Sequence, residues 1–453
     1  MTALVPLVAL WSAGLLLLRC WGPDVDRKPA RWPPAAAESI GLGVAVSYLV
    51  FLWGVWVRPA GASWLAVVPT LAACACLLRR RRAEGTEGAA PAAPWTLGEK
   101  GTALAVAFVL ATLLALLFAT PLLDWDARIL WALKAKILAA ERTLVSDTFR
   151  DPYRLHIHPR YPLLVPWLAS LPAQVAGRFR EAHFQAVAAL AALLGVLQLY
   201  RMARSWGSRQ AALLAALLLV LTAGWQRSLF AAGVELWLSL FLLLGVQALW
   251  RWLERGHAAD LCLAGVYLFG CASVKNEGLV LAASLVAGLG LVLLARGWGG
   301  RRDLAALLGL PAVWCALMSV WWWHVRFIPP VSDENYLARL RPENLPEALG
   351  RLPLLARELA AHALDVGTWH LIWVTLPIVC FLVWRRGARS DPQGLLLVAT
   401  CALYGAAIAA VYLFTPWRDP ALQIQVTFDR VFLPLLPLAV LLILRAAPCR
   451  PRA

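Results

Sequence analysis

Long apolar segments recur along this chain and alternate with short charged loops, and this alternation is the strongest constraint on its fold. A helix needs about 20 apolar residues to cross a bilayer. Because 61% of the residues are hydrophobic, against about 45–50% in soluble domains, we predict an all-α polytopic membrane protein. The sequence predicts thirteen spans, at 3–21, 36–57, 61–78, 102–120, 182–203, 210–226, 231–250, 258–274, 279–296, 303–324, 368–384, 393–414 and 430–445.

The basic residues between these segments predict the orientation, since Lys and Arg concentrate in cytoplasmic loops. The run Arg79 to Arg82 predicts a cytoplasmic linker, which places residues 121–181 outside. Continued alternation puts the N-terminus outside and the C-terminus in the cytoplasm. The opening MTALVPLVALW has no basic leader and predicts a retained span rather than a signal peptide. The net charge of +16 follows from the same bias, so no nucleic-acid partner is expected.

The chain divides into three regions by its loops. Residues 1–101 hold the first spans and the basic linker, residues 102–300 hold the outer loop 121–181, and residues 301–453 hold the C-terminal spans. The last region has two further long outer loops, at 325–367 and 415–429. Long loops on one face of a membrane bundle are where function concentrates, so we expect the site on the outer face.

Two segments of the first outer loop predict helices that lie in the membrane interface. Residues 126–141 have a helical period, and residues 162–177 are apolar but interrupted by proline. In the first segment, apolar side chains are expected on one side and the basic ones mostly on the other. The apolar side comprises Ile129, Leu130, Leu133, Ile137 and Leu138, and the basic side comprises Arg128, Lys134 and Lys136.

The nine cysteines show no CxxC pair and lie almost wholly in apolar segments. This usage predicts neither a disulfide framework nor a zinc site.

Asp124 and Asp126 stand where a span leaves the membrane, a costly place for a carboxylate without a partner or a task. Either could act as a general base on an acceptor hydroxyl, or bind a divalent ion. The structural alternative is that Asp126 is the N-cap of the helix that follows. The sequence does not separate these interpretations.

The motif HIHPRYP supplies His156, His158 and Arg160 downstream of this acidic pair. The two histidines and the two aspartates allow a divalent cation, Mg²⁺ or Mn²⁺, without requiring one. Exposed surface histidines are the alternative, and no motif requires any other cofactor.

Three further polar positions are predicted near the outer ends of spans. Glu235 lies just inside a span and should face a polar cavity. Lys275 and Glu277, in SVKNEGL, connect two spans, and Lys275 could act as a point charge for a phosphate. The alternative for this pair is a hairpin turn with a Lys–Glu ion pair. Arg430 begins the last span and could anchor it or bind an anionic headgroup.

In this order, these motifs resemble the GT-C superfamily of integral membrane glycosyltransferases. The nearest pattern is the clan of protein O-mannosyltransferases and lipid A aminoarabinose transferases, which is glycosyltransferase family 39-like. The resemblance covers roughly residues 100–300 and is carried by the acidic first outer loop, the HPxYP motif, the acid at the start of a span and the K-x-E-G turn. The chain departs from the family in reading DWD where the best-known relatives have adjacent acids, and in the three spans that precede the usual first one.

The resemblance implies an enzyme that moves a sugar from a polyprenyl-phosphate donor to an acceptor hydroxyl on the non-cytoplasmic face, with inversion. It implies residues 102–300 as the catalytic core and Asp126 or Asp124 as the base. The donor phosphate and sugar are expected to contact residues from four parts of the chain: Lys275, Glu277, Glu235, Arg430, Arg160, His158 and Lys134. The acceptor, whether lipid, polysaccharide or protein, is not inherited from any relative.

Two other functions fit the same sequence. A lipid-linked glycan flippase or transporter would have polar residues near mid-membrane, whereas here they gather at the outer ends of spans. An enzyme like the O-antigen ligases would move a whole glycan from a polyprenyl diphosphate and would need similar cations. The Ala, Arg, Leu and Trp bias indicates a bacterial gene, and hence the inner (plasma) membrane of the cell envelope with a periplasmic or extracellular active site.

Overall fold

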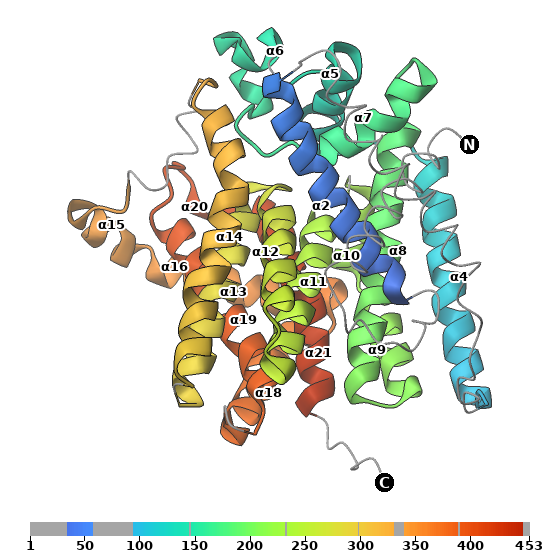
Figure 1. Cartoon of the computed structure of the whole chain (residues 1–453), viewed down its shortest axis with the longest axis vertical. Coiled ribbons are helices and arrows are strands. Elements are labelled where there is room, and N and C mark those ends of the chain that lie inside the picture. Colours follow the sequence, from blue (N-terminus) through green and yellow to red (C-terminus); the bar gives the residue numbers. More distant parts are fainter. Residues whose placement is uncertain are drawn as a thin grey trace.

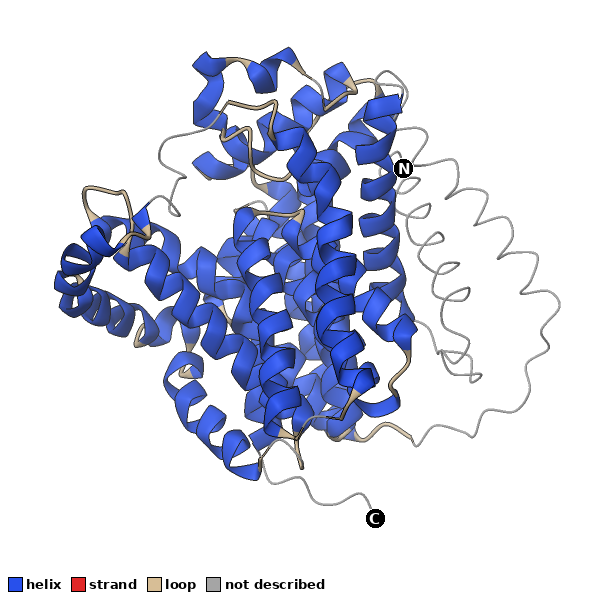
Figure 2. Cartoon of the chain, turned by 60° about the vertical axis from the view of Figure 1, so that its left-hand side comes forward, coloured by secondary structure: helices blue, strands red, loops and turns tan. Residues whose placement is uncertain are grey.

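The computed structural model describes residues 34–57, 94–144, 146–231, 233–297, 299–329, 339–387 and 390–446. Within these ranges every regular element is a helix, which confirms the all-α prediction (Figure 2). The long helices run side by side, and shorter helices lie over one end of this bundle (Figure 1).

Seven helices of the described residues are long and apolar enough to cross a membrane, and each matches a predicted span to within a few residues or extends it. They show that the chain is an integral membrane protein. These spans are α4 (Leu97–Ala119), α8 (Glu181–Trp206), α11 (Val234–Arg255), α13 (Asn276–Ala295), α14 (Arg301–Val325), α19 (Pro392–Leu413) and the stretch Pro420–Ala446, composed of α20 (Pro420–Phe432), η6 (Leu433–Leu435) and α21 (Leu436–Ala446).

An eighth span is bent. The predicted span 210–226 is α9 (Arg209–Leu221) followed by α10 (Ala223–Phe230), at 58° to each other. Thr222 between them is extended, with ψ 118°. A Cβ on Gly224 would lie 2.6 Å from the ring of Trp369, so α10 approaches α17 (Val366–Trp369) at a distance that only glycine permits.

The predicted total of thirteen spans is not reached among the described residues. The predicted spans 3–21 and 61–78 lie outside them. Three others are shorter or interrupted helices: α2 (Pro34–Val57), whose described apolar part is 37–52, α12 (Ala258–Ala272), and α18 (Ile372–Arg386), which the turn at His370 separates from α17. The number of spans beyond these seven or eight stays a prediction.

Residues 121–181, the loop predicted to lie outside, form a helical cap at one end of the bundle (Figure 1). Its elements are η1 (Ala127–Ala132, a π-helix), α5 (Leu133–Glu141), α6 (Asp147–Arg150), η2 (Pro152–Ile157) and α7 (Leu164–Ala176). The two predicted helices are therefore present, and α5 packs against α7. Their position in a membrane interface stays a prediction.

One prediction for the cap is wrong. Arg128 and Lys136 are exposed as expected, but Lys134 is fully buried. Its Nζ lies 5.3 Å from the ring centres of both Trp131 and Tyr161 and donates to the carbonyl of His158 at 2.7 Å. The helical period does not predict the burial of Lys134, because it does not show that two aromatic faces and a carbonyl surround the ammonium.

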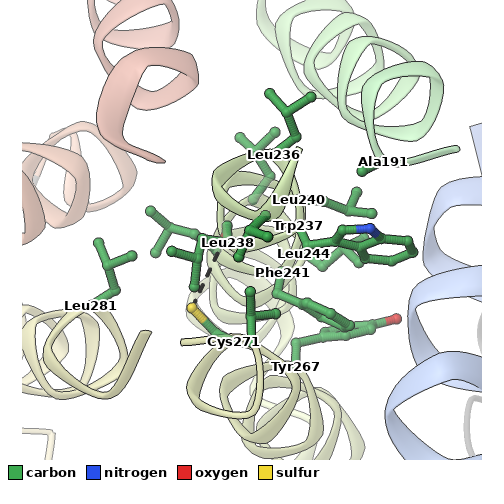
Figure 3. Packing of buried hydrophobic residues seen from close by; sticks show 14 of the residues in the cluster. Ala191, Leu236, Trp237, Leu238, Leu240, Phe241, Leu244, Tyr267, Cys271 and Leu281 are labelled. Carbon is green, nitrogen blue, oxygen red and sulfur yellow. Dashed lines mark hydrogen bonds between the residues drawn. The ribbon is translucent and has the colours of Figure 1, made fainter. Parts of the chain in front are cut away.

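The centre of the bundle is α11, which is apolar almost all round and therefore buried on every side. It packs against α8 and α12. Figure 3 shows Trp237 and Phe241 of α11 close to Tyr267 and Cys271 of α12. A Cβ on Gly270 would lie 2.4 Å from the Phe241 ring, so the two helices meet at a glycine.

The helix ends that carry the predicted cytoplasmic basic residues are joined by ion pairs. Buried Glu38 of α2 bonds Arg201 of α8 at 2.5 Å and Arg251 of α11 at 2.8 Å. The neighbouring helix ends are tied by Arg296–Asp303 at 2.6 Å and Arg445–Asp391 at 2.8 Å. These contacts place the basic ends of the helices together, as the loop charges predict.

Candidate active site

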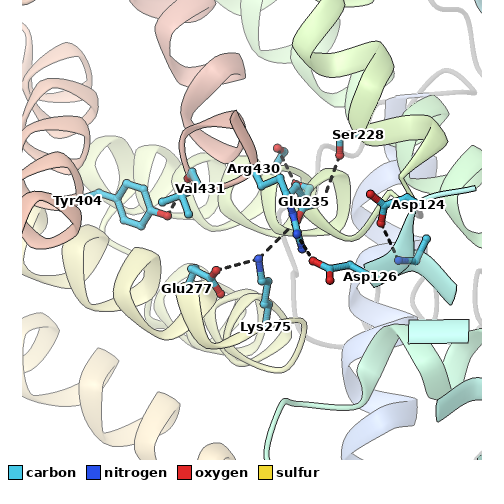
Figure 4. Close-up of polar contacts among 11 residues, drawn as sticks. Asp124, Asp126, Ser228, Glu235, Lys275, Glu277, Tyr404, Arg430 and Val431 are labelled. Atoms are coloured by element: carbon cyan, nitrogen blue, oxygen red, sulfur yellow. Dashed lines mark hydrogen bonds and ion pairs between the residues drawn. The ribbon is translucent and has the colours of Figure 1, made fainter. Parts of the chain in front are cut away.

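The two aspartates of the first outer loop have different roles in the structure. Asp124 Oδ1 accepts the backbone N–H of Ala127 at 2.8 Å, so Asp124 caps the turn that starts η1. Asp126 makes no capping bond, and its own backbone is already helical. The interpretation of Asp126 as the N-cap is therefore wrong. Its carboxylate points instead toward Arg430 (Figure 4).

Arg430 of α20 joins two carboxylates that are far apart in the sequence. Its Nη1 contacts Oδ2 of Asp126, and its Nε lies 3.3 Å from Oε1 of Glu235. The sequence separations are 304 and 195 residues, so only the folded bundle brings these groups together. The side chains of Arg430 and Asp126 are 29% and 23% exposed, whereas that of Glu235 is 2% exposed.

Lys275 extends this set of ions. Its Nζ lies 3.5 Å from Oε1 of Glu235 and 2.8 Å from Oε1 of Glu277. We call the five residues Asp126, Arg430, Glu235, Lys275 and Glu277 the ionic row, which Figure 4 shows end to end. The predicted Lys–Glu pair is thus present, but it is part of a larger network rather than a simple hairpin turn.

Local structure explains why both glutamates of the row meet there. Glu235 is in the first turn of α11 and Glu277 in the first turn of α13, where the positive end of the helix dipole favours a carboxylate. Gly233 starts α11 in the left-handed region, φ 64°, and a Cβ there would lie 2.7 Å from Ala188. This turn brings Ser228 back to Glu235, with Oγ 3.3 Å from Oε2.

The buried carboxylate of Glu235 needs the cations of the row as partners. An ionised carboxylate as buried as Glu235 is stable only when paired and hydrogen-bonded, and Lys275, Arg430 and Ser228 do this. Three carboxylates against two cations leave one formal negative charge in the row. Glu277 Oε2 is buried with no hydrogen-bond partner among the described residues. The row therefore has one carboxylate more than its own cations neutralise.

The remaining predicted site residues form a second group in the cap. Lys134 binds the carbonyl of His158, which has a positive φ of 46°, and the His158 ring lies 5.1 Å from that of Tyr161. Arg160 donates two hydrogen bonds to the carbonyl of Ile328, at 3.0 and 2.9 Å. These contacts hold the HPxYP segment against the chain that follows α14, and none of them joins the ionic row.

The proposed metal ligands do not come together. Among the described residues no three His, Cys, Asp or Glu side chains are close enough to bind one ion. Asp126 is paired with Arg430, and Asp124 caps a helix, whereas His156 is exposed in the cap. Asp124, Asp126, His156 and His158 therefore form no set of three or more ligands in the part of the chain that the structure describes, and a divalent cation stays a prediction.

Sequence reasoning missed two contacts around the row. Ser228 was not identified, although its spacing of seven residues from Glu235 and the intervening glycine are visible signals. The pair Arg227–Asp429, at 3.2 Å, also joins α10 to α20 beside the row. Arg227 and Asp429 both lie in loops that the predicted spans place outside. Their pairing was not predicted, because it depends on the bend between α9 and α10.

One family model matches the chain. Residues 159–323 match the model described as dolichyl-phosphate-mannose-protein mannosyltransferase, a stretch that contains Glu235, Lys275 and Glu277. Asp126 and Arg430 lie outside the match, and the structure joins them to it. No curated protein and no solved structure matches the chain. The resemblance predicted from the sequence is confirmed over residues 159–323, where the chain is similar to the dolichyl-phosphate-mannose-protein mannosyltransferase family, a family of membrane glycosyltransferases of the GT-C type.

Proposed function

We propose that the protein transfers a sugar from a polyprenyl-phosphate donor to an acceptor hydroxyl on the non-cytoplasmic face of the membrane. The observation that supports this most is the contact of Arg430 with both Asp126 and Glu235. It brings a carboxylate of the outer loop and a cation of the last described span to the matched family segment. A base and a cation side by side are what displacement of a phosphate by a hydroxyl needs.

In the proposed reaction, Asp126 accepts the proton of the acceptor hydroxyl. The hydroxyl oxygen attacks the anomeric carbon while the bond from that carbon to the phosphate oxygen breaks. The electron pair goes to the polyprenyl phosphate, which leaves, and direct attack inverts the anomeric configuration. Arg430 is the partly exposed cation of the row, so we assign it to the phosphate. Binding of the phosphate by Arg430 would release Asp126 from its ion pair and make it available as the base.

The other residues of the row position these two. Lys275 is 6% exposed and held between Glu235 and Glu277. Lys275 therefore neutralises the two glutamates and does not contact the donor phosphate itself. Through Glu235 it helps to orient Arg430. Asp124 is occupied as a helix cap, which favours Asp126 as the base.

The test uses the full chain in lipid nanodiscs with polyprenyl-phosphate sugars as donors, chosen from lipids that co-purify with it. Asp126→Asn should lower sugar transfer by about 10²- to 10⁴-fold, the usual contribution of a general base. The matched control is Asp124→Asn, which should retain transfer. Equal loss in both variants, or full activity in Asp126→Asn, contradicts the assignment.

Two outcomes would favour the other functions. Movement of the lipid-linked glycan across the bilayer without an acceptor, and without sugar transfer, would indicate a flippase. Activity only with a polyprenyl-diphosphate glycan would indicate an enzyme like the O-antigen ligases.

A further inference from the structure

A helical arm leaves the bundle after α14. The arm is residues 339–364 and contains η5 (Pro342–Asn344), α15 (Leu345–Gly350) and α16 (Leu352–Ala363). Figure 1 shows α15 projecting away from the bundle, with α16 between it and α20. Such a projecting element needs contacts on more than one side to be stable, because short helices are marginal alone.

One face of the arm packs on the bundle. Leu355 is buried, and Arg351 Nη1 donates to the carbonyls of Leu413 and Thr415 at 2.9 and 3.0 Å. These carbonyls lie at the C-terminal end of α19, where cations are favourable. The arm is therefore fixed to the bundle along this face.

A second face of the arm is apolar and exposed. Leu345 and Leu349 are one turn apart on α15, Leu352 is in the first turn of α16, and the three side chains are 48%, 53% and 44% exposed. Ala356 and Ala360, also exposed, continue the row at the same helical spacing. We call these five residues the leucine face. Several exposed leucines on two successive helices are unfavourable in water and are typical of an interaction surface.

The charged side chains of the arm are paired away from the leucine face. Glu347 binds Arg339 at 2.9 Å and also contacts Arg351. Glu343 and Arg341 are within 3.7 Å of each other and are the most exposed pair of the arm. The arm therefore has a charged side with an excess of arginine and an apolar side with exposed leucines, an amphipathic pattern typical of a segment that lies in the membrane interface.

The surroundings of the arm also suit lipid. Trp417, near the carbonyls that Arg351 binds, is 37% exposed. Exposed tryptophans at the ends of spans mark the boundary of the bilayer. The arm is thus fixed to the bundle two residues before an exposed tryptophan, Trp417.

The arm in turn contacts α20. Gln425 Nε2 donates to Glu358 at 3.4 Å, and the His362 ring stacks on Phe428, with centroids 4.9 Å apart. Phe428 precedes Arg430 by two residues on the same helix. The helix that supplies Arg430 to the ionic row is therefore braced from outside by the arm.

We propose that the arm is a lipid-binding surface whose leucine face lies against the acyl chains of the bilayer, and that this contact holds α20 in place. The proposal concerns lipid contact and does not depend on which reaction the ionic row performs.

A photo-cross-linking experiment tests the lipid contact directly. The full chain carries benzoylphenylalanine in place of Leu349 and is irradiated in nanodiscs of phosphatidylethanolamine and phosphatidylglycerol. The expected result is a lipid adduct by mass spectrometry, several-fold more abundant than with the same probe at Glu343. Equal lipid labelling at both positions, or a cross-link from position 349 to a second copy of the chain, would overturn the proposal.

Hydrogen exchange tests the effect on α20. In a variant with Leu345, Leu349 and Leu352 all replaced by Ser, the amides of α16 and α20 should exchange faster in nanodiscs. The matched variant with Met at the three positions keeps the apolar surface and should exchange as the wild type does. Unchanged exchange in α11 shows that the bundle is folded. Unchanged exchange in α20 of the Ser variant would rule out the bracing.

Discussion

Lys275 and Glu235 are joined across two neighbouring helices, with Nζ 3.5 Å from Oε1 and neither side chain more than 6% exposed. Removing one partner of a buried ion pair leaves the other charge buried without compensation. We therefore expect Lys275→Ala to destabilise the folded protein by about 3 kcal/mol, measured by thermal unfolding in detergent. Adding Glu235→Gln should recover part of the loss, and a double variant no more stable than Lys275→Ala would contradict the pairing.

Arg430 is expected to tolerate lysine poorly. A lysine at position 430 keeps the charge but has no planar fork to reach Asp126 and Glu235 from two nitrogens. Arg430→Lys should lower sugar transfer by about 10-fold or more, a loss of about 1.4 kcal/mol in transition-state stabilisation. The matched control is Arg227→Lys, because Arg227 is 62% exposed and its ion pair with Asp429 contributes little. Equal losses in both variants would show that the fork at 430 has no special role.

Chelation should leave the activity unchanged. The predicted aspartate and histidine ligands form no group of three among the described residues, and the charge that a metal would supply to a phosphate is available from Arg430. Transfer measured before and after dialysis against EDTA should therefore agree. A loss that Mg²⁺ or Mn²⁺ restores, but Ca²⁺ does not, would contradict this expectation.

Gly224→Ala should displace the bent span. The new Cβ would lie 2.6 Å from the Trp369 ring, and overpacking of this kind costs about 1–3 kcal/mol. A lower thermal midpoint is expected, together with faster hydrogen exchange in α10 and α17. Gly195→Ala is the matched control, because Gly195 lies within α8 and a Cβ there has no atom within 4 Å. If both substitutions have the same effect, the contact with Trp369 does not set the bend.

The sequence was sufficient for the spans but not for their contacts. Runs of about 20 apolar residues located α4, α8, α11, α13, α14 and α19 to within a few residues, because length and composition alone decide whether a helix can span. Lys134 was misplaced because the period of a helix shows which side a residue faces, but not which neighbour covers it. The aromatic rings and carbonyl around Lys134 come from separate parts of the cap.

For the candidate site too, the sequence predicted the positions of residues but not all of their contacts. Glu235, Lys275 and Arg430 were identified from their positions at the outer ends of spans, and the structure brings them together. Which aspartate contacts Arg430 depends on the backbone of a single turn. In the structure Asp124 caps that turn and Asp126 forms the ion pair with Arg430. Ser228 depends on the left-handed turn at Gly233, a feature of three-dimensional packing against Ala188.

The residues of the ionic row are synthesised at different times, and this order has a consequence for how the protein folds. A nascent chain emerges from its N-terminus, so Glu235 and Lys275 are inserted before α20 has been made. Until then the carboxylate of Glu235 has only part of its final neutralisation, and the helix that carries it is held less firmly. Arrival of Arg430 completes the charge balance at Glu235. Folding of the bundle around the ionic row would thus be complete only when α20 contacts α11 and its arginine pairs with Glu235.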